Sequence, residues 1–167
     1  MLDEVLMKLY FFGRTYARPG LAGGTGIISI MLPDLGVLYR TQFAGTQAEC
    51  EYTAALMALK FVENNKSVFK NQKLELLSDS AELVENVNSI TMLPPNLKVY
   101  RDSVLIYLKK FDIKLSWVPM AENRAAQHLP QIPPLKNKLN LQFDFGQKGR
   151  DSALIDGIPG KSVFPAK

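Results

Sequence analysis

The chain has 167 residues, which is the size of a single ordinary domain. Apolar residues make up 47% and charged residues 22%, which excludes a wholly disordered, collagen-like or disulfide-rich small protein. One cysteine and one histidine exclude an internal disulfide, a cysteine-based zinc site and any multi-histidine metal site. The net charge of +4 is compatible with a phosphate-bearing partner but does not require one.

The sequence contains no apolar run of the roughly 18 residues that a membrane-spanning helix needs. Its first residues, Met1-Leu2-Asp3-Glu4, are acidic and lack the basic flank and apolar run of a secretory signal. We therefore expect an intracellular, cytoplasmic protein that does not interact with membranes.

The first part of the chain predicts an antiparallel meander. The run Met7 to Gly13 is almost continuously apolar, which is typical of a strand buried on both faces. A loop over 14–23 follows, and Pro33 to Gly36 have the residue types of a tight turn. Because the loops are short, the strands they join should pair antiparallel. The strands are expected over residues 7–13, 24–32 and 37–44.

The middle of the chain alternates predicted helices and strands. Thr46 is a good helix cap, and apolar residues then recur at helical spacing. Pro94 and Pro95 block any continuation of the helix expected over 80–88. Helices between strands imply parallel crossovers, so the sheet should be mixed. Helices are expected over 47–64, 80–88, 96–111 and 121–129, and strands over 73–78 and 113–118.

Residues 130–167 differ in composition from residues 1–129, which we take as the domain. They hold five of the ten prolines and carry a charge of +3, against +1 for the rest of the chain. Large apolar residues such as Leu139, Phe143 and Phe164 are too frequent for a free linker. We expect an extension that packs on the domain or on a protein partner, for example as a strand added to a sheet edge.

Short motifs at the joints between these elements carry the functional argument. The first strand ends in Tyr10-Phe11-Phe12-Gly13, and the second begins with Gly24-Thr25-Gly26-Ile27-Ile28. The first helix contains Ala48-Glu49-Cys50-Glu51-Tyr52, and the fourth strand ends in Ser78-Asp79-Ser80. Trp117-Val118-Pro119 precedes Asn123-Arg124-Ala125-Ala126-Gln127-His128-Leu129.

This order of motifs resembles ribonuclease H and its short bacterial and archaeal relatives, over about residues 7–129. The resemblance implies a three-layer α/β fold whose five-stranded mixed sheet has three antiparallel strands followed by two parallel ones. It also implies cleavage of the RNA strand of RNA–DNA hybrids by two divalent metals that four carboxylates hold. Glu51 and Asp79 match two of those carboxylates.

The other two carboxylate positions depart from the family pattern. Phe12 stands where the central aspartate belongs, and Gln127 stands where the last aspartate belongs. Magnesium prefers oxygen ligands in near-octahedral geometry, and a phenyl ring offers none. We therefore expect no cofactor, with Mg²⁺ or Mn²⁺ bound at Glu51 and Asp79 only if activity remains. The alternative for these two acids is structural, with Asp79 helping Ser80 to cap the next helix and Glu51 in solvent.

Positions beside the site suggest contacts with a nucleic acid. Arg14, Thr15 and Gln47 match family positions that touch the substrate, so Arg14 could meet a phosphate and Gln47 a base edge or 2′-hydroxyl. Trp117 is expected to pack under the last helix. Three lysines near the third long helix fit either phosphate contacts or a solvated helix end. These lysines are Lys109, Lys110 and Lys114.

Three functions follow from these residues. The first is a catalytically degenerate ribonuclease H-like domain that binds a nucleic acid, as hybrid or duplex, or a protein. The second is a working ribonuclease that recruits Glu51 and Asp79 with unusual ligands such as Gln127 or Glu122. The third is a structural or oligomer-forming module.

Overall fold

The computed structural model describes residues 6–16 and 25–127. Its five strands form one mixed sheet in the order β3-β2-β1-β4-β5. The first three strands pair antiparallel, β4 runs parallel to β1, and β5 runs parallel to β4. The expected mixed sheet is therefore confirmed. The strands are β1 (Leu6–Tyr16), β2 (Thr25–Leu32), β3 (Val37–Ala44), β4 (Lys73–Ser78) and β5 (Lys114–Trp117).

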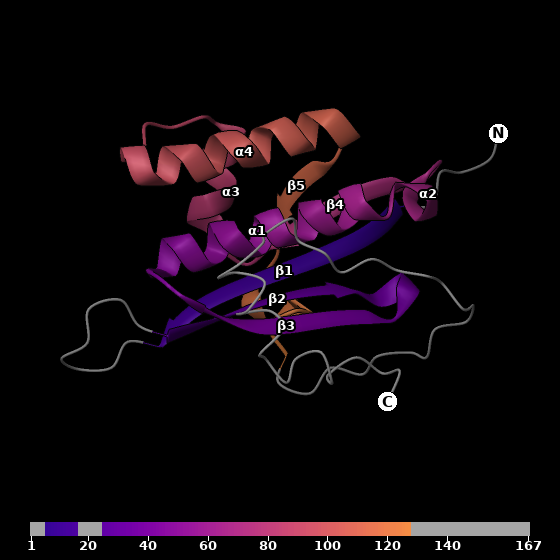
Figure 1. Ribbon diagram of the computed structural model, residues 1–167, viewed down its shortest axis with the longest axis horizontal. Coiled ribbons are helices and arrows are strands. Elements are labelled where there is room, and N and C mark those ends of the chain that lie inside the picture. The colour runs from indigo at the N-terminus through magenta and orange to yellow at the C-terminus, as the bar shows by residue number, and fades with distance from the viewer. Residues whose placement is uncertain (1–5, 17–24, 128–167) are drawn as a thin grey trace.

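The helices form two layers over one face of the sheet, with α1 against β1 and β2 and with α4 packed on α1 (Figure 1). None of the helices in the described ranges is long and apolar enough to cross a bilayer. Short 3₁₀ turns cover Pro33–Leu35 and Met120–Glu122. The helices are α1 (Gln47–Asn64), α2 (Lys66–Phe69), α3 (Ala81–Asn88) and α4 (Pro95–Phe111).

Helix α1 begins where its sequence predicts, because Thr46 forms a capping box. The Thr46 hydroxyl accepts a hydrogen bond from the Glu49 backbone N–H at 3.2 Å, and the Glu49 carboxylate accepts one from the Thr46 N–H at 3.0 Å. Apolar residues at helical spacing, including Leu59 and Val62, are buried along α1. This capped start fixes the position of Glu51, one turn into the helix.

Two glycines allow the strands to approach α1 closely. A Cβ added to Gly13 would lie 2.5 Å from the backbone carbonyl of Cys50. A Cβ on Gly26 would lie 2.5 Å from the Cys50 sulfur and 2.9 Å from the Arg14 carbonyl oxygen. A side chain at position 13 would therefore push α1 away from the sheet, and one at position 26 would displace the Cys50 thiol and press on the neighbouring strands.

The sheet has an apolar cluster on each face. The larger cluster lies under the helices and includes Phe11, Ile30 and Leu76. The smaller cluster lies on the opposite face, where the segment after β5 covers it with Ala125. Since successive strand residues alternate between faces, Phe11 belongs to the first cluster and Phe12 to the second. Both are at most 9% exposed, which confirms that β1 is buried on both sides.

The expected helix over 121–129 is wrong for the residues that the structure describes. A 3₁₀ turn covers Met120–Glu122, and Asn123 then takes an extended backbone conformation (φ −79°, ψ 103°). The buried Asn123 side chain causes this break. Its amide nitrogen donates to the Phe11 carbonyl oxygen at 2.9 Å, and its amide oxygen accepts from the Ala125 N–H at 3.0 Å. These tertiary bonds replace the bonds of a helix.

Smaller differences between the predicted and observed elements lie at the ends of strands and in one short extra helix. Strand β1 continues to Tyr16, through residues expected in a loop, because Arg14 to Tyr16 keep pairing with β2. Strand β5 covers only Lys114–Trp117, and the single turn α2 was not expected. The predicted extension, residues 130–167, lies outside the described residues.

Candidate functional site

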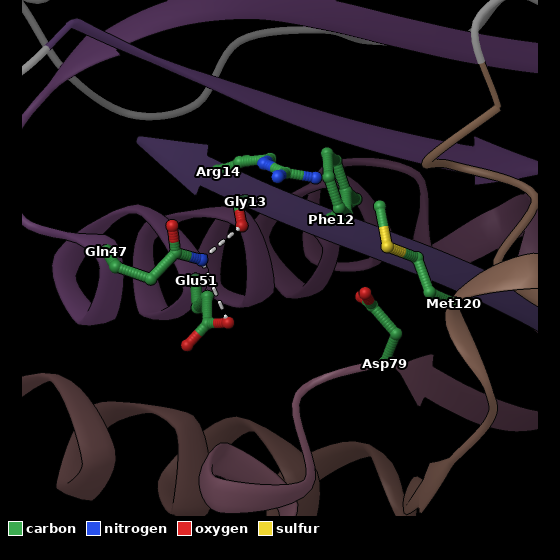
Figure 2. A pocket seen from close by; sticks show the side chains of 7 residues that line it. All are labelled: Phe12, Gly13, Arg14, Gln47, Glu51, Asp79 and Met120. Atoms are coloured by element: carbon green, nitrogen blue, oxygen red, sulfur yellow. Dashed lines mark hydrogen bonds between the residues drawn. The ribbon is translucent and has the colours of Figure 1, made fainter. Parts of the chain in front are cut away.

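An open groove of about 240 Å³ lies where the carboxyl-terminal parts of β1 and β4 meet the first turns of α1. Figure 2 shows Phe12 and Arg14 extending from β1, with Gln47 and Glu51 on the α1 side and with Asp79 and Met120 facing them. The fold thus brings together residues that are far apart in the sequence. The lining consists of Phe12, Gly13, Arg14, Gln47, Glu51, Asp79 and Met120.

Gln47 connects β1 to the first turn of α1. Its amide nitrogen donates to the Gly13 carbonyl oxygen at 2.8 Å and to the Glu51 carboxylate at 3.1 Å. Its amide oxygen accepts from the Thr15 backbone N–H at 2.9 Å. The amide therefore holds Glu51 in place and closes the end of the strand, in addition to lining the groove.

Glu51 is half-buried, and each of its carboxylate oxygens accepts a hydrogen bond. Ser80 donates to Oε1 and Gln47 donates to Oε2, both at 3.1 Å. Burial raises the pKa of the Glu51 carboxyl, and the charges of Asp79 and Glu82 raise it further, while the two hydrogen bonds oppose this change. The sequence alternative of a fully solvated Glu51 is therefore not what the structure contains.

Asp79 follows β4 and is held by the segment after β5. The Asn123 amide donates to its Oδ1 at 2.8 Å, and the Trp117 indole N–H donates to its backbone carbonyl oxygen at 3.2 Å. Ser80 caps α3 by accepting from the Leu83 N–H at 3.2 Å. The cap is thus Ser80, and the Asp79 carboxylate is directed to Asn123 and the groove (Figure 2).

The two positions that lack the expected acid lie in different surroundings. Phe12 is 9% exposed and packs in the smaller core while one part of it lines the groove. Gln127 is half-buried and is not among the lining residues. Arg40 donates to the backbone carbonyl oxygens of Ala125 at 3.1 Å and Gln127 at 2.8 Å, which fixes this segment on the sheet. Burial lowers the pKa of this guanidinium.

The donor set does not fit a pair of divalent metal ions. Glu51 and Asp79 are the carboxylates that line the groove, and both already accept hydrogen bonds from protein donors. The Phe12 ring supplies no oxygen between them. Within residues 6–16 and 25–127, no three acidic, histidine or cysteine side chains lie close enough together to hold a metal. Two-metal chemistry needs bridging and terminal oxygen ligands that this groove lacks.

The other residues that were expected at the site differ in whether they line the groove. Arg14 is exposed and lines the groove. Thr15 does not line it, because its hydroxyl is turned toward α1, where it donates to the Gly45 carbonyl oxygen at 3.0 Å and lies 3.1 Å from the Cys50 sulfur. The expectation that Trp117 packs under a last helix is wrong, since 51% of it is exposed.

Met120 is a lining residue that sequence analysis missed. Its side chain lies beside Asp79 and extends toward Phe12, and 47% of it is exposed. Its position, three residues after Trp117 and immediately after Pro119, is the only sequence feature that could have placed it near the groove. Its importance depends on the unexpected 3₁₀ turn, which a helix over 121–129 would have replaced.

The comparisons with known proteins agree with this architecture. A family model described as reverse transcriptase-like matches residues 22–131. Among curated protein sequences, none matches the chain. Among solved structures, LC11-RNase H1, which was isolated from compost by a metagenomic approach, has a TM-score of 0.63 at 16% identity, over 74% of this chain and 91% of that chain.

Two further structures give similar values. RNase H1 from the halophilic archaeon Halobacterium salinarum has a TM-score of 0.56 at 22% identity, over 73% of this chain and 92% of that chain. LC11-RNase H1 solved in complex with an RNA/DNA hybrid has a TM-score of 0.59 at 17% identity, over 70% of this chain and 88% of that chain. At these identities the likeness shows a common fold.

Proposed function

Because the chain belongs to the reverse transcriptase-like family and has the ribonuclease H fold, we propose that it binds nucleic acid without cleaving it. The observation that carries this proposal is Phe12, whose ring forms part of the groove wall where the family pattern has its central aspartate. A substrate-binding fold that lacks metal ligands can keep its binding role after its chemistry is lost.

The choice of nucleic acid rests on the fold and on the groove. One neighbour of the same fold was solved with an RNA/DNA hybrid, which makes a hybrid the first ligand to test. Arg14 is an exposed cation beside the groove and can meet a phosphate. Gln47 has a smaller role in this proposal than the sequence suggested, because its amide already bonds to β1 and Glu51.

The test combines binding and cleavage measurements on one labelled RNA–DNA hybrid. We expect fluorescence anisotropy to show binding that weakens as salt rises, because neutralised phosphates release counterions. Gel analysis with Mg²⁺ or Mn²⁺ should show an intact RNA strand. Arg14→Gln should weaken binding severalfold, whereas Lys98→Gln on α4, away from the groove lining, should not.

Two results would contradict the proposal. Metal-dependent cleavage that Asp79→Ala abolishes would establish a working ribonuclease with an unusual site. The absence of both binding and cleavage, together with a concentration-dependent dimer, would support the structural module. A protein partner reached through residues 130–167 stays a prediction, because those residues lie outside the described structure.

A further inference from the structure

The charges of the described residues are separated between the two ends of the molecule. At the end opposite the groove, the last turns of α1 and α4, the turn α2 and the starts of β1, β4 and β5 come together, on the right in Figure 1. We call this surface the lysine end. Its cations are Lys8, Lys60, Lys66, Lys70, Lys73, Lys109, Lys110 and Lys114.

Contacts between elements confirm that these lysines share one end. Glu63 on α1 binds both Lys60 at 2.7 Å and Lys110 of α4 at 2.9 Å. The Asp112 carboxylate, after α4, lies 3.9 Å from Lys73 at the start of β4.

The strand starts contribute a row of their own. Lys8 of β1 is in register with Glu75 of β4, and Glu75 is in register with Lys114 of β5. The acids at the lysine end are Asp34 in the turn after β2, Glu63, Glu75 and Asp112. Eight cations and four acids give this end a net charge of +4. The rest of the described chain has five cations and seven acids, a net charge of −2.

The groove end therefore attracts the backbone of a polyanion less strongly than the lysine end does, although Arg14 supplies a cation there. Two carboxylate side chains, Glu51 and Asp79, line the groove, and carboxylates repel the phosphates of a nucleic-acid backbone. The 18 residues of α1 separate the two ends by about 27 Å. This is several times the Debye length of about 8 Å at physiological salt, so each end presents its own potential to a ligand.

We propose that the lysine end is a phosphate-binding surface that holds the backbone of a nucleic acid. This inference rests on the proposed function and adds where most of the binding free energy arises. Lysines are compact cations that contact phosphates without reading base edges. The exposed aromatic side chains of the described residues, Tyr16 and Trp117, both lie at the groove end. The lysine end thus has neither the stacking groups of base recognition nor the aromatic anchors of a membrane interface.

The proposal predicts binding that does not depend on sequence, and it is tested by removing two exposed lysines. Lys70→Gln with Lys109→Gln lowers the charge of the lysine end by two and disturbs no ion pair that the structure contains among its described residues. The control, Asn96→Asp with Lys98→Gln, lowers the charge by the same amount at the opposite end of α4, where it also removes the exposed Lys98–Asp102 ion pair. Circular dichroism should show that both variants are folded.

The measurement is the affinity for the labelled hybrid, and for a duplex of unrelated sequence, as a function of salt. The lysine-end variant should bind both ligands about tenfold more weakly, and its log–log salt slope should fall by about 2, since each phosphate contact contributes about 0.9. The control should keep the slope of the unsubstituted protein.

Each other outcome has a distinct meaning. Equal affinities and slopes in the two variants, with clear binding by the unsubstituted protein, overturn the lysine end as the binding surface and leave the proposed function standing. Absence of any nucleic-acid binding overturns both. A final measurement tests binding of the protein to vesicles of phosphatidylserine and phosphatidylcholine. If the vesicles bind the protein but not the lysine-end variant, while the hybrid binds both proteins equally, the surface is assigned to anionic lipid instead.

Discussion

Phe12 is the residue on which the proposed lack of cleavage depends. Its ring is part of the smaller core, together with Met31 and Leu77, and it also forms part of the groove wall. An acid at this position would exchange buried apolar area for a charge beside Glu51 and Asp79. The sequence alone raised this interpretation, and the structure places the ring in the groove with no other acid in its place among the lining residues.

Restoring the family acid should therefore destabilise the protein. We expect Phe12→Asp to lower the free energy of unfolding by about 3 kcal/mol or more, as for the loss of other buried aromatic side chains. Phe12→Leu keeps most of the apolar volume and should cost less than about 1.5 kcal/mol. Urea unfolding followed by circular dichroism measures both. A Phe12→Asp variant as stable as the unsubstituted protein would show that the ring does not contribute to the core.

At the level of elements, ion pairs join α1 to α4. Glu63 receives hydrogen bonds from Lys60 and Lys110, and these bonds lower the pKa of its carboxyl from 4.5 to about 2. Tyr52 of α1 also stacks on Tyr100 of α4, with ring centroids 6.4 Å apart. The two helices are thus connected by charge as well as by apolar packing.

This connection predicts a pH dependence of stability with a definite sign. The bonds favour the ionised Glu63, so their contribution is complete above pH 4.5 and is lost as the pH falls toward 2. Glu63→Gln should be less stable than the unsubstituted protein at neutral pH, and the difference should disappear under acid. Urea unfolding at several pH values measures it. Asp34→Asn removes the same charge from an exposed position and should show no such trend. If the stability difference between Glu63→Gln and the unsubstituted protein is the same at every pH, the proposed pairing of Glu63 is refuted.

At the scale of the whole molecule, the groove should give no stabilisation by metal. A ligand at free concentration L that binds only the folded state stabilises it by RT ln(1 + L/Kd), and so raises the melting temperature once its concentration exceeds its Kd. We expect about 10 mM Mg²⁺ or Mn²⁺ to shift the melting temperature no more than NaCl of equal ionic strength. A larger shift that Asp79→Asn removes would mean that the remaining acids still hold an ion.

The chain's order of elements was predictable because local patterns set it. Thr46 and Glu49 cap α1 through neighbouring backbone groups, and the apolar runs of β1 and β2 produce buried strands wherever they pair. The replacement at position 12 was likewise visible in the sequence. The segment from Trp117 to Gln127 was not, because its conformation depends on bonds from Asn123 to Phe11 and Asp79 and from Arg40 to Ala125, across distant parts of the chain.

The sequence by itself determined that positions 12 and 127 carry a phenyl ring and an amide where the family pattern has carboxylates, since neither group can be a carboxylate in any fold. Only the tertiary structure decided where the charges lie. The net charge of +4 gives no hint that eight lysines meet at one end while the remaining described residues are net acidic. That separation arises because parallel strands start at one edge of a sheet and the helices between them end there.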